Sequence, residues 1–128
     1  MIELHELLGD DGLVEPRREG KFVLLRLHGQ RHLCLAPRGV ASFHAQIVER
    51  FCAARGLACR SVPAQERPEV APELEVEGGG RYDLDEVGRA LRLFGASVAY
   101  GPFPRDGLRD LLAASPRLAG YTLLVEPS

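Results

Sequence analysis

The stretch KFVLLRLHG, residues 21 to 29, constrains the fold more than any other part of this chain. It is a short, almost continuous apolar run of β-favouring residues that begins at Lys21 and stops at Gly29. A strand that lacks regularly alternating polar positions is typical of one that is buried on both faces. We therefore expect this segment to be the central strand of a sheet.

Five further segments are predicted as strands, because they are short apolar runs or alternate between apolar and polar residues next to turn residues. They are RHLCLAP (31–37), LACRSV (57–62), LEVEGGGRYDL (74–84), RALRLFGASVAYG (89–101) and YTLLVEP (121–127). The first can pair with the central strand. The third and fourth are expected to pair with each other through a turn near residues 85 to 88.

Two segments have helical periodicity. In residues 43 to 55 apolar side chains recur on one face with polar side chains opposite, and Gly56 supplies a C-terminal stop. In LRDLLAAS, residues 108 to 115, three leucines predict a second, shorter helix that ends before Pro116.

A proline-rich segment interrupts this alternation. Pro63, Pro68 and Pro72 exclude regular ladder or helix structure, so we expect an exposed insert at 63–73. We interpret it as a loop extension, with a lid or a partner surface as alternatives. The 128 residues otherwise fit one domain, 1–128, because about 100 to 150 residues is the usual domain size.

Composition excludes several classes of function. A formal net charge of -2 argues against general affinity for nucleic acid or for acidic membranes. No apolar run approaches the roughly 20 residues that span a bilayer, and the acidic N-terminus is unlike a signal peptide. We expect a cytoplasmic monomer that binds neither nucleic acid nor membrane.

The three cysteines indicate neither a disulfide framework nor a zinc site. Cys34, Cys52 and Cys59 cannot all pair, and none stands in a C-x-x-C spacing. Carboxylates are not clustered in the sequence either. We expect reduced cysteines in the core, and no metal site.

His44 stands in the first turn of the longer predicted helix. It precedes Ile47 and Val48 by three and four residues, so it lies on the inward face at the rim. With Ser42 as the expected N-cap, the N–H groups of His44 and Ala45 are free to bind an anion, and the helix end disfavours imidazolium. A neutral histidine there is a candidate nucleophile or base. The alternative is an ordinary first-turn residue bonded to a neighbouring carbonyl.

Two other segments fit the same anion pocket. In EGGGRY, residues 77 to 82, three glycines precede Arg81, and such glycines admit a ligand close to the backbone or form a bulge. In FGASVAYGP, residues 94 to 102, the Ser97 hydroxyl and the amides near Ala99 can line a second wall. Taken singly, a bulge and tight packing explain the two segments.

Together, KFVLLRLH, RG followed by FHA, GGGR and SVAYGP resemble, in that order, the motifs of the protein histidine phosphatases of the Janus/Ocnus family. The resemblance covers nearly the whole chain. It implies a single α/β domain, with a mixed β-sheet flanked by a helix on either side. It also implies a hydrolase that removes phosphate from phosphohistidine without a metal cofactor.

The resemblance assigns residue roles as well. His44 matches the catalytic histidine of the family. The residues that match phosphate-binding positions are Lys21, Arg38, Ala45, Arg81, Ser97 and Ala99. Two departures are visible, since Gln46 replaces an aspartate of the animal members and the spacing from Arg38 to His44 is shorter.

The expected partner is therefore a phosphohistidine-containing protein or peptide, with inorganic phosphate as the product. Whether His44 attacks phosphorus or activates water stays open at this point. One alternative is a phosphate-binding or phosphoprotein-binding module that uses the same pocket without turnover. Another is an interaction protein whose working surface is the proline-rich insert.

Overall fold

The computed structural model describes residues 2–8, 14–60 and 67–127. The strands in this part of the chain are β1 (Ile2–Glu6), β2 (Arg17–Leu27), β3 (Gln30–Pro37), β4 (Cys59–Arg60), β5 (Glu69–Val70), β6 (Leu74–Asp85), β7 (Ala90–Phe94), β8 (Ala96–Ser97), β9 (Gly101–Pro102) and β10 (Thr122–Val125). The helices are α1 (His44–Arg55) and α2 (Leu108–Ala113), and a 3-10 turn at Pro116–Leu118 follows α2.

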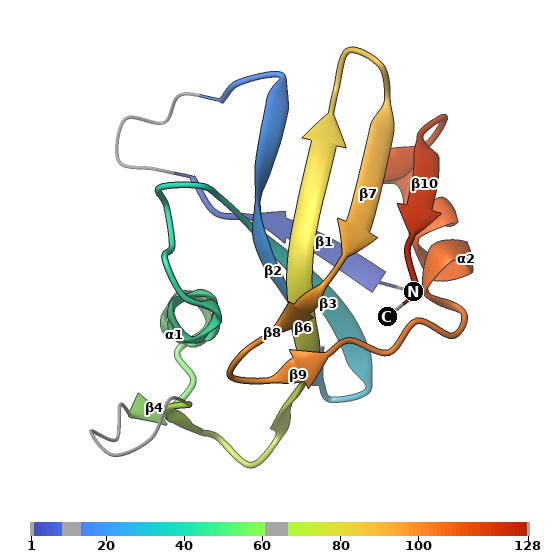
Figure 1. Ribbon diagram of the computed structural model, residues 1–128. Coiled ribbons are helices and arrows are strands. Elements are labelled where there is room, and N and C mark those ends of the chain that lie inside the picture. The colour runs from blue at the N-terminus through green and yellow to red at the C-terminus, as the bar shows by residue number, and fades with distance from the viewer. Residues whose placement is uncertain (1, 9–13, 61–66, 128) are drawn as a thin grey trace.

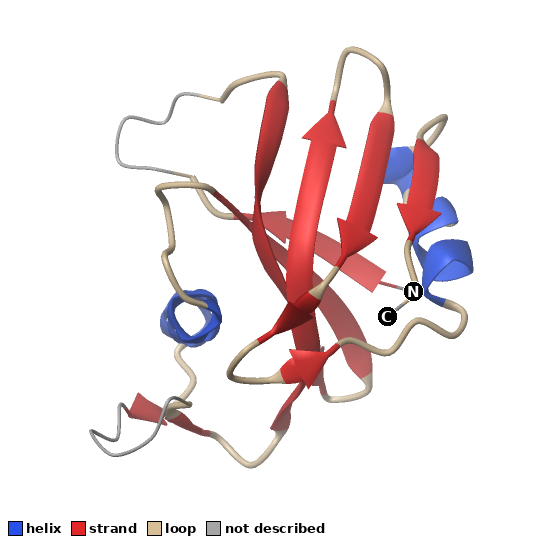
Figure 2. Ribbon diagram, in the orientation of Figure 1, coloured by secondary structure: helices blue, strands red, loops and turns tan. Residues whose placement is uncertain are grey.

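Six of the described strands form one mixed sheet, in the order β1-β3-β2-β6-β7-β10 (Figure 1). The four inner strands pair antiparallel, whereas the edge strands β1 and β10 run parallel to β3 and β7. Helix α1 covers one face and α2 the other (Figure 2). This arrangement confirms the predicted fold class, a single α/β domain with a helix on either side of a mixed sheet.

The strand β2 is central and buried on both faces, as its sequence predicts. Phe22, Val23, Leu24 and Leu25 are each 0% exposed. Phe22 and Leu24 pack in the cluster beneath α2, while Val23 and Leu25 pack beneath α1. Because a fully buried side chain of this size contributes about 1.5–3 kcal/mol, this strand anchors both halves of the core.

Most of the other predicted elements are confirmed, one of them with a change of extent. Strands β3, β6, β7 and β10 and both helices lie within or close to their predicted ranges. The expected strand 89–101 leaves the main sheet after Phe94, because Gly95 takes the left-handed conformation (φ 73°). Ala96–Ser97 then pairs with Gly101–Pro102 in a separate small ladder.

The prediction that the proline-rich insert excludes a ladder is wrong for part of it. Glu69–Val70 pairs antiparallel with Cys59–Arg60, and Ala71 is buried. The ladder is possible because Pro68 and Pro72 lie just outside the two paired residues, where their missing N–H groups are not needed. Residues 61–66, which include part of the predicted strand 57–62 and of the insert, lie outside the described residues.

Strand β1 is an element that the sequence analysis does not predict. The strand has only five residues, IELHE, and three of them are polar, so hydrophobic periodicity gives a weak signal. Pairing with β3, which is itself far away in the sequence, stabilises β1 as an edge strand.

A buried arginine links β1, β2 and the turn after β6. The Arg18 side chain is 5% exposed, and its guanidinium donates to both carboxylate oxygens of Glu6, at 2.6 and 2.7 Å. It also lies 3.3 Å from the Glu86 carboxylate, and Tyr82 donates to Glu6. The arginine therefore compensates the charge of two carboxylates at one end of the sheet.

We predict that Arg18→Met lowers the free energy of unfolding by about 3–5 kcal/mol, because it leaves the Glu6 carboxylate partly buried without its counter-charge. Arg17→Met is the matched control, since Arg17 is the neighbouring residue and its side chain is 81% exposed. That control should cost about 0–1 kcal/mol. Urea unfolding of both variants measures the difference, and equal stabilities would contradict the role of Arg18.

Candidate functional site

Helix α1 begins one residue later than expected. Phe43 is the N-cap, with φ -132° and ψ 149°, and His44 is the first helical residue, so the prediction of Ser42 as N-cap is wrong. The reason is Gln46, whose side-chain oxygen accepts from the N–H groups of Ser42 and Phe43 at 2.7 and 3.1 Å. The Gln46 side chain thus reaches back to the backbone of the two residues before the helix and fixes where the helix starts.

The ring of His44 is held in one tautomer. His44 is 7% exposed, and its Nε2 lies 2.9 Å from the carbonyl oxygen of Gly80. A carbonyl oxygen only accepts, so Nε2 carries the hydrogen and a neutral ring has its lone pair on Nδ1. Among the described residues Nδ1 has no hydrogen-bond partner. The lone pair is therefore not used by any residue in the described part of the chain.

The surroundings of His44 favour this neutral form. Burial lowers its pKa below the ordinary value of 6.5, and the positive charges of Lys21 and Arg81 lower it further. The hydrogen bond to Gly80 acts in the opposite direction and is outweighed. Near neutral pH the side chain is consequently an uncharged base.

The glycine run makes room for the imidazole ring. A Cβ atom on Gly79 would lie 2.9 Å from Cδ2 of His44 and 2.6 Å from the Phe22 carbonyl oxygen. The pairing of β2 with β6 also changes register here, with Leu24 opposite Gly78 but Leu25 opposite Val76. The predicted bulge is thus present, and the next glycine lets the ring lie against the strand.

His44 lies in a cleft of about 670 Å³ between the start of α1, strands β2 and β6, and the β8–β9 turn. Lys21 and Arg81 are register partners on the two strands, so their side chains lie on the same face. Both line the cleft, and the N–H groups of His44 and Ala45 belong to the first turn, where helix geometry leaves them without an intrahelical acceptor. Cations and backbone donors thus gather around the imidazole.

The rim of the same cleft has a different character. Phe43 is 68% exposed and Val98 is 93% exposed, and both line the cleft. Ala96 and Ala99 add to this apolar part of the lining, and the Glu49 carboxylate also lines the cleft. The cleft therefore combines a cationic floor with an apolar rim.

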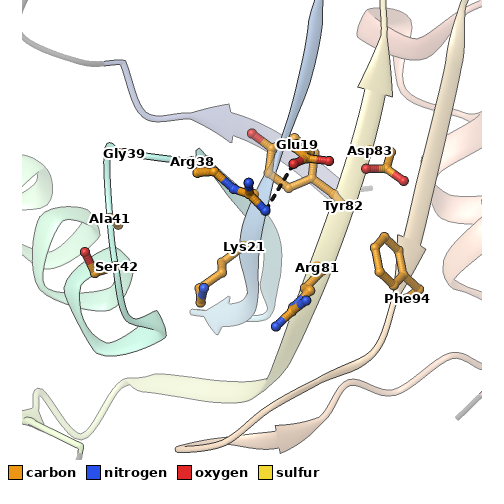
Figure 3. Close-up of a pocket in the computed structure, with 11 residues that line it drawn as sticks. Glu19, Lys21, Arg38, Gly39, Ala41, Ser42, Arg81, Tyr82, Asp83 and Phe94 are labelled. Carbon is orange, nitrogen blue, oxygen red and sulfur yellow. Dashed lines mark ion pairs between the residues drawn. The ribbon is translucent and has the colours of Figure 1, made fainter.

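The structure brings five of the seven predicted site residues to this cleft: Lys21, His44, Ala45, Arg81 and Ala99. Arg38 instead lines an adjoining hollow of about 360 Å³, which shares Lys21, Ser42 and Arg81 with the cleft (Figure 3). Its exposed guanidinium pairs with Glu19 at 3.2 Å. Ser97 is buried, and its hydroxyl accepts the N–H of Tyr100, so it shapes the β8–β9 turn.

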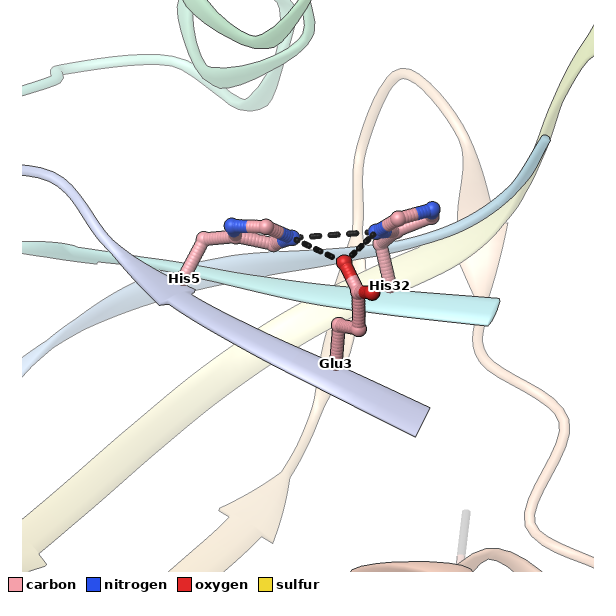
Figure 4. Close-up of side chains that lie close together, drawn as sticks. All are labelled: Glu3, His5 and His32. Atoms are coloured by element: carbon pink, nitrogen blue, oxygen red, sulfur yellow. Dashed lines mark hydrogen bonds and ion pairs between the residues drawn. The ribbon is translucent and has the colours of Figure 1, made fainter. Parts of the chain in front are cut away.

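A second group of chemically active side chains is not expected from the sequence. Glu3, His5 and His32 converge on the α1 side of strands β1 and β3 (Figure 4). His32 stands far from Glu3 and His5 in the sequence, and the three form no metal-binding motif. A correct prediction of β1 and its parallel register with β3 was the only signal that could have brought them together.

The chain matches no protein-family model and no curated protein. In the described part of the chain, no helix is long and apolar enough to cross a membrane.

We predict that His44 titrates with a midpoint below 6.5 and keeps its hydrogen on Nε2 at neutral pH. The sign follows from burial, because the folded state binds a proton less readily than the unfolded state and loses stability as the pH falls below 6.5. Long-range ¹⁵N–¹H correlation spectra across an acid titration measure both quantities. A midpoint above 6.5, or a hydrogen on Nδ1, would contradict this description of the site.

Proposed function

We propose that this protein is a metal-independent phosphohistidine phosphatase, a hydrolase of the P–N bond in phosphohistidine proteins or peptides. The observation that carries the proposal is a neutral His44 in a cleft with Lys21 and Arg81, fixed through Nε2 and with no partner for Nδ1 among the described residues. The resemblance to the Janus/Ocnus phosphatases adds support, because the motifs that carry it supply these residues.

The arrangement suits phosphoryl transfer. This reaction requires positioning and stabilisation of the charge on the equatorial phosphoryl oxygens. Lys21, Arg81 and the N–H groups of His44 and Ala45 can donate to those oxygens at one location. A phosphate held there would lie next to the Nδ1 lone pair, with no need for a metal ion.

Phosphohistidine is the substrate that such a site can hydrolyse most readily. Water adds its oxygen to phosphorus, the P–N bond breaks, and its electron pair and a proton pass to the leaving imidazole nitrogen. A protonated imidazole leaves far more easily than the alkoxide of phosphoserine. His44 Nδ1 either takes the proton from the attacking water or attacks phosphorus first and forms a transient phosphoenzyme.

The apolar rim supports a protein or peptide as the substrate. Exposed Phe43 and Val98 can contact the polypeptide on each side of the phosphorylated histidine, whereas inorganic phosphate makes no use of them. Ser97 acts in this proposal by holding the β8–β9 turn, whereas Arg38, paired with Glu19 in the adjoining hollow, has no direct part in it.

A non-catalytic phosphate-binding module is the second candidate function, because the cation and N–H donors would hold an anion without any reaction.

We predict that His44→Ala abolishes phosphate release from a phosphohistidine peptide but still binds inorganic phosphate, since the backbone donors and Lys21 remain. Phosphate release and isothermal titration with phosphate measure the two effects. A folded His44→Ala protein with parental turnover would contradict the role of His44, and a parent protein that binds phosphate without turnover would favour the binding module.

We predict that Lys21→Met and Arg81→Met each lower kcat/KM by about one to two decades, because each removes a charge-assisted hydrogen bond of roughly 1.5–3 kcal/mol to phosphate. Arg26→Met is the matched control, since Arg26 lies on β2 with Lys21 but pairs with Glu77 on an exposed surface. The control should keep the parental kinetics. Unchanged kinetics in both test variants would show that phosphate does not bind in this cleft.

A further inference from the structure

We propose that Glu3, His5 and His32 form a zinc site, with one water molecule as the fourth ligand. Three potential ligand atoms point toward one another: Nε2 of His5, Nδ1 of His32 and a carboxylate oxygen of Glu3 (Figure 4). Two histidines and one carboxylate are a ligand set that Zn²⁺ binds in proteins. The site uses none of the residues of the His44 cleft, so it does not depend on the function proposed above.

The backbone places these ligands before any metal binds. Glu3 and His32 are register partners in the parallel pair of β1 and β3. His5 follows Glu3 by two residues, so both side chains leave β1 on the same face. The rigid sheet thereby sets the positions of all three ligands.

The distances between the ligand atoms suit a tetrahedral ion. Zn–N and Zn–O bonds of about 2.0–2.1 Å require ligand atoms about 3.3–3.4 Å apart at tetrahedral angles. The measured separations are 2.9 Å between the two histidine nitrogens, 3.4 Å from Glu3 to His32 and 3.7 Å from Glu3 to His5. These values lie on both sides of the required one, so shifts of a few tenths of an ångström complete the geometry.

Metal binding also sets the protonation state of the two histidine rings. Neutral imidazoles are the form that binds metal. To coordinate Zn²⁺, each ring holds its hydrogen on the nitrogen that faces away from the cluster.

The environment leaves one side of the cluster open. The side chain of His32 is 3% exposed and lies against the Phe51 ring of α1, whereas Glu3 and His5 are 50% and 31% exposed. Water can therefore approach from the side of β1, the edge strand, and occupy the fourth position. Zinc bound here would link β1 to β3 beneath the C-terminal half of α1.

Arg55 provides a test in which a substitution should raise the affinity for zinc. Its guanidinium lies 3.5 Å from the same Glu3 oxygen that faces the histidines, and it stacks on Phe51. It therefore competes with the ion for Glu3 and repels a second positive charge. Removal of Arg55 should therefore tighten zinc binding, whereas a cluster that binds no zinc would show no such change.

The experiment is a zinc titration of the untagged full chain after EDTA treatment and dialysis, in competition with a chromophoric chelator. We expect one Zn²⁺ per chain, and a higher Tm with zinc than without it. Glu3→Gln and His5→Gln should each weaken binding at least about tenfold, whereas Arg55→Met should strengthen it. His28→Asn, which removes an exposed histidine on the β2–β3 turn, should bind as the parent does.

A parent chain that binds no stoichiometric zinc would overturn the proposal, and so would Glu3→Gln and His5→Gln variants with parental affinity. Glu3 is half exposed, so Glu3→Gln should fold and decides the outcome if His5→Gln does not. The visible spectrum of the Co²⁺-substituted chain gives a second readout, because a tetrahedral site has intense d–d bands and the Glu3→Gln variant should lose them. Phosphate release by Glu3→Gln should stay parental, which separates this proposal from the phosphatase.

Discussion

The pairing of β2 with β6 is the constraint on which the rest of the structure depends. It holds β2 in the centre of the sheet, where α1 and α2 cover its apolar run on both faces, and it brings Lys21 beside Arg81. The bulge in this same pair lies next to Gly79 and Gly80, which accommodate and bind the His44 ring. The core and the candidate active site are thus products of one strand pair, so a change in its register would disturb both.

Most of this fold follows from short-range patterns in the sequence. The apolar run at 21–29, the helical periodicity after Phe43 and the Gly56 stop each reflect local preferences that tertiary packing then reinforces. Strand β1 and the start of α1 do not follow in this way. The first depends on a partner strand distant in sequence, and the second on the Gln46 side chain, which accepts from the N–H groups of Ser42 and Phe43.

The residues of the candidate site also divide into those that local sequence patterns predict and those that they do not. His44, Lys21 and Arg81 are each tied to a predicted element, so their convergence follows once the strands pair. Arg38 lies on a loop, whose path the sequence does not encode through periodicity, and it pairs with Glu19 beside the cleft. The Glu3–His5–His32 cluster lies against Phe51 of α1, which is about 10 Å from His44 along a helix that rises 1.5 Å per residue. The proposed zinc site and the proposed metal-free phosphatase site therefore lie at different places along the same helix.

The most direct test of the central claim is phosphate release by the EDTA-treated parent protein from two peptides of one sequence, one with phosphohistidine and one with phosphoserine. A site that supplies charge stabilisation and a neutral base, but no metal, should cleave the P–N bond and leave the phosphoserine ester intact. We predict catalytic release from the first peptide alone. Absence of release from the phosphohistidine peptide, or release that requires an added divalent ion, would contradict the account.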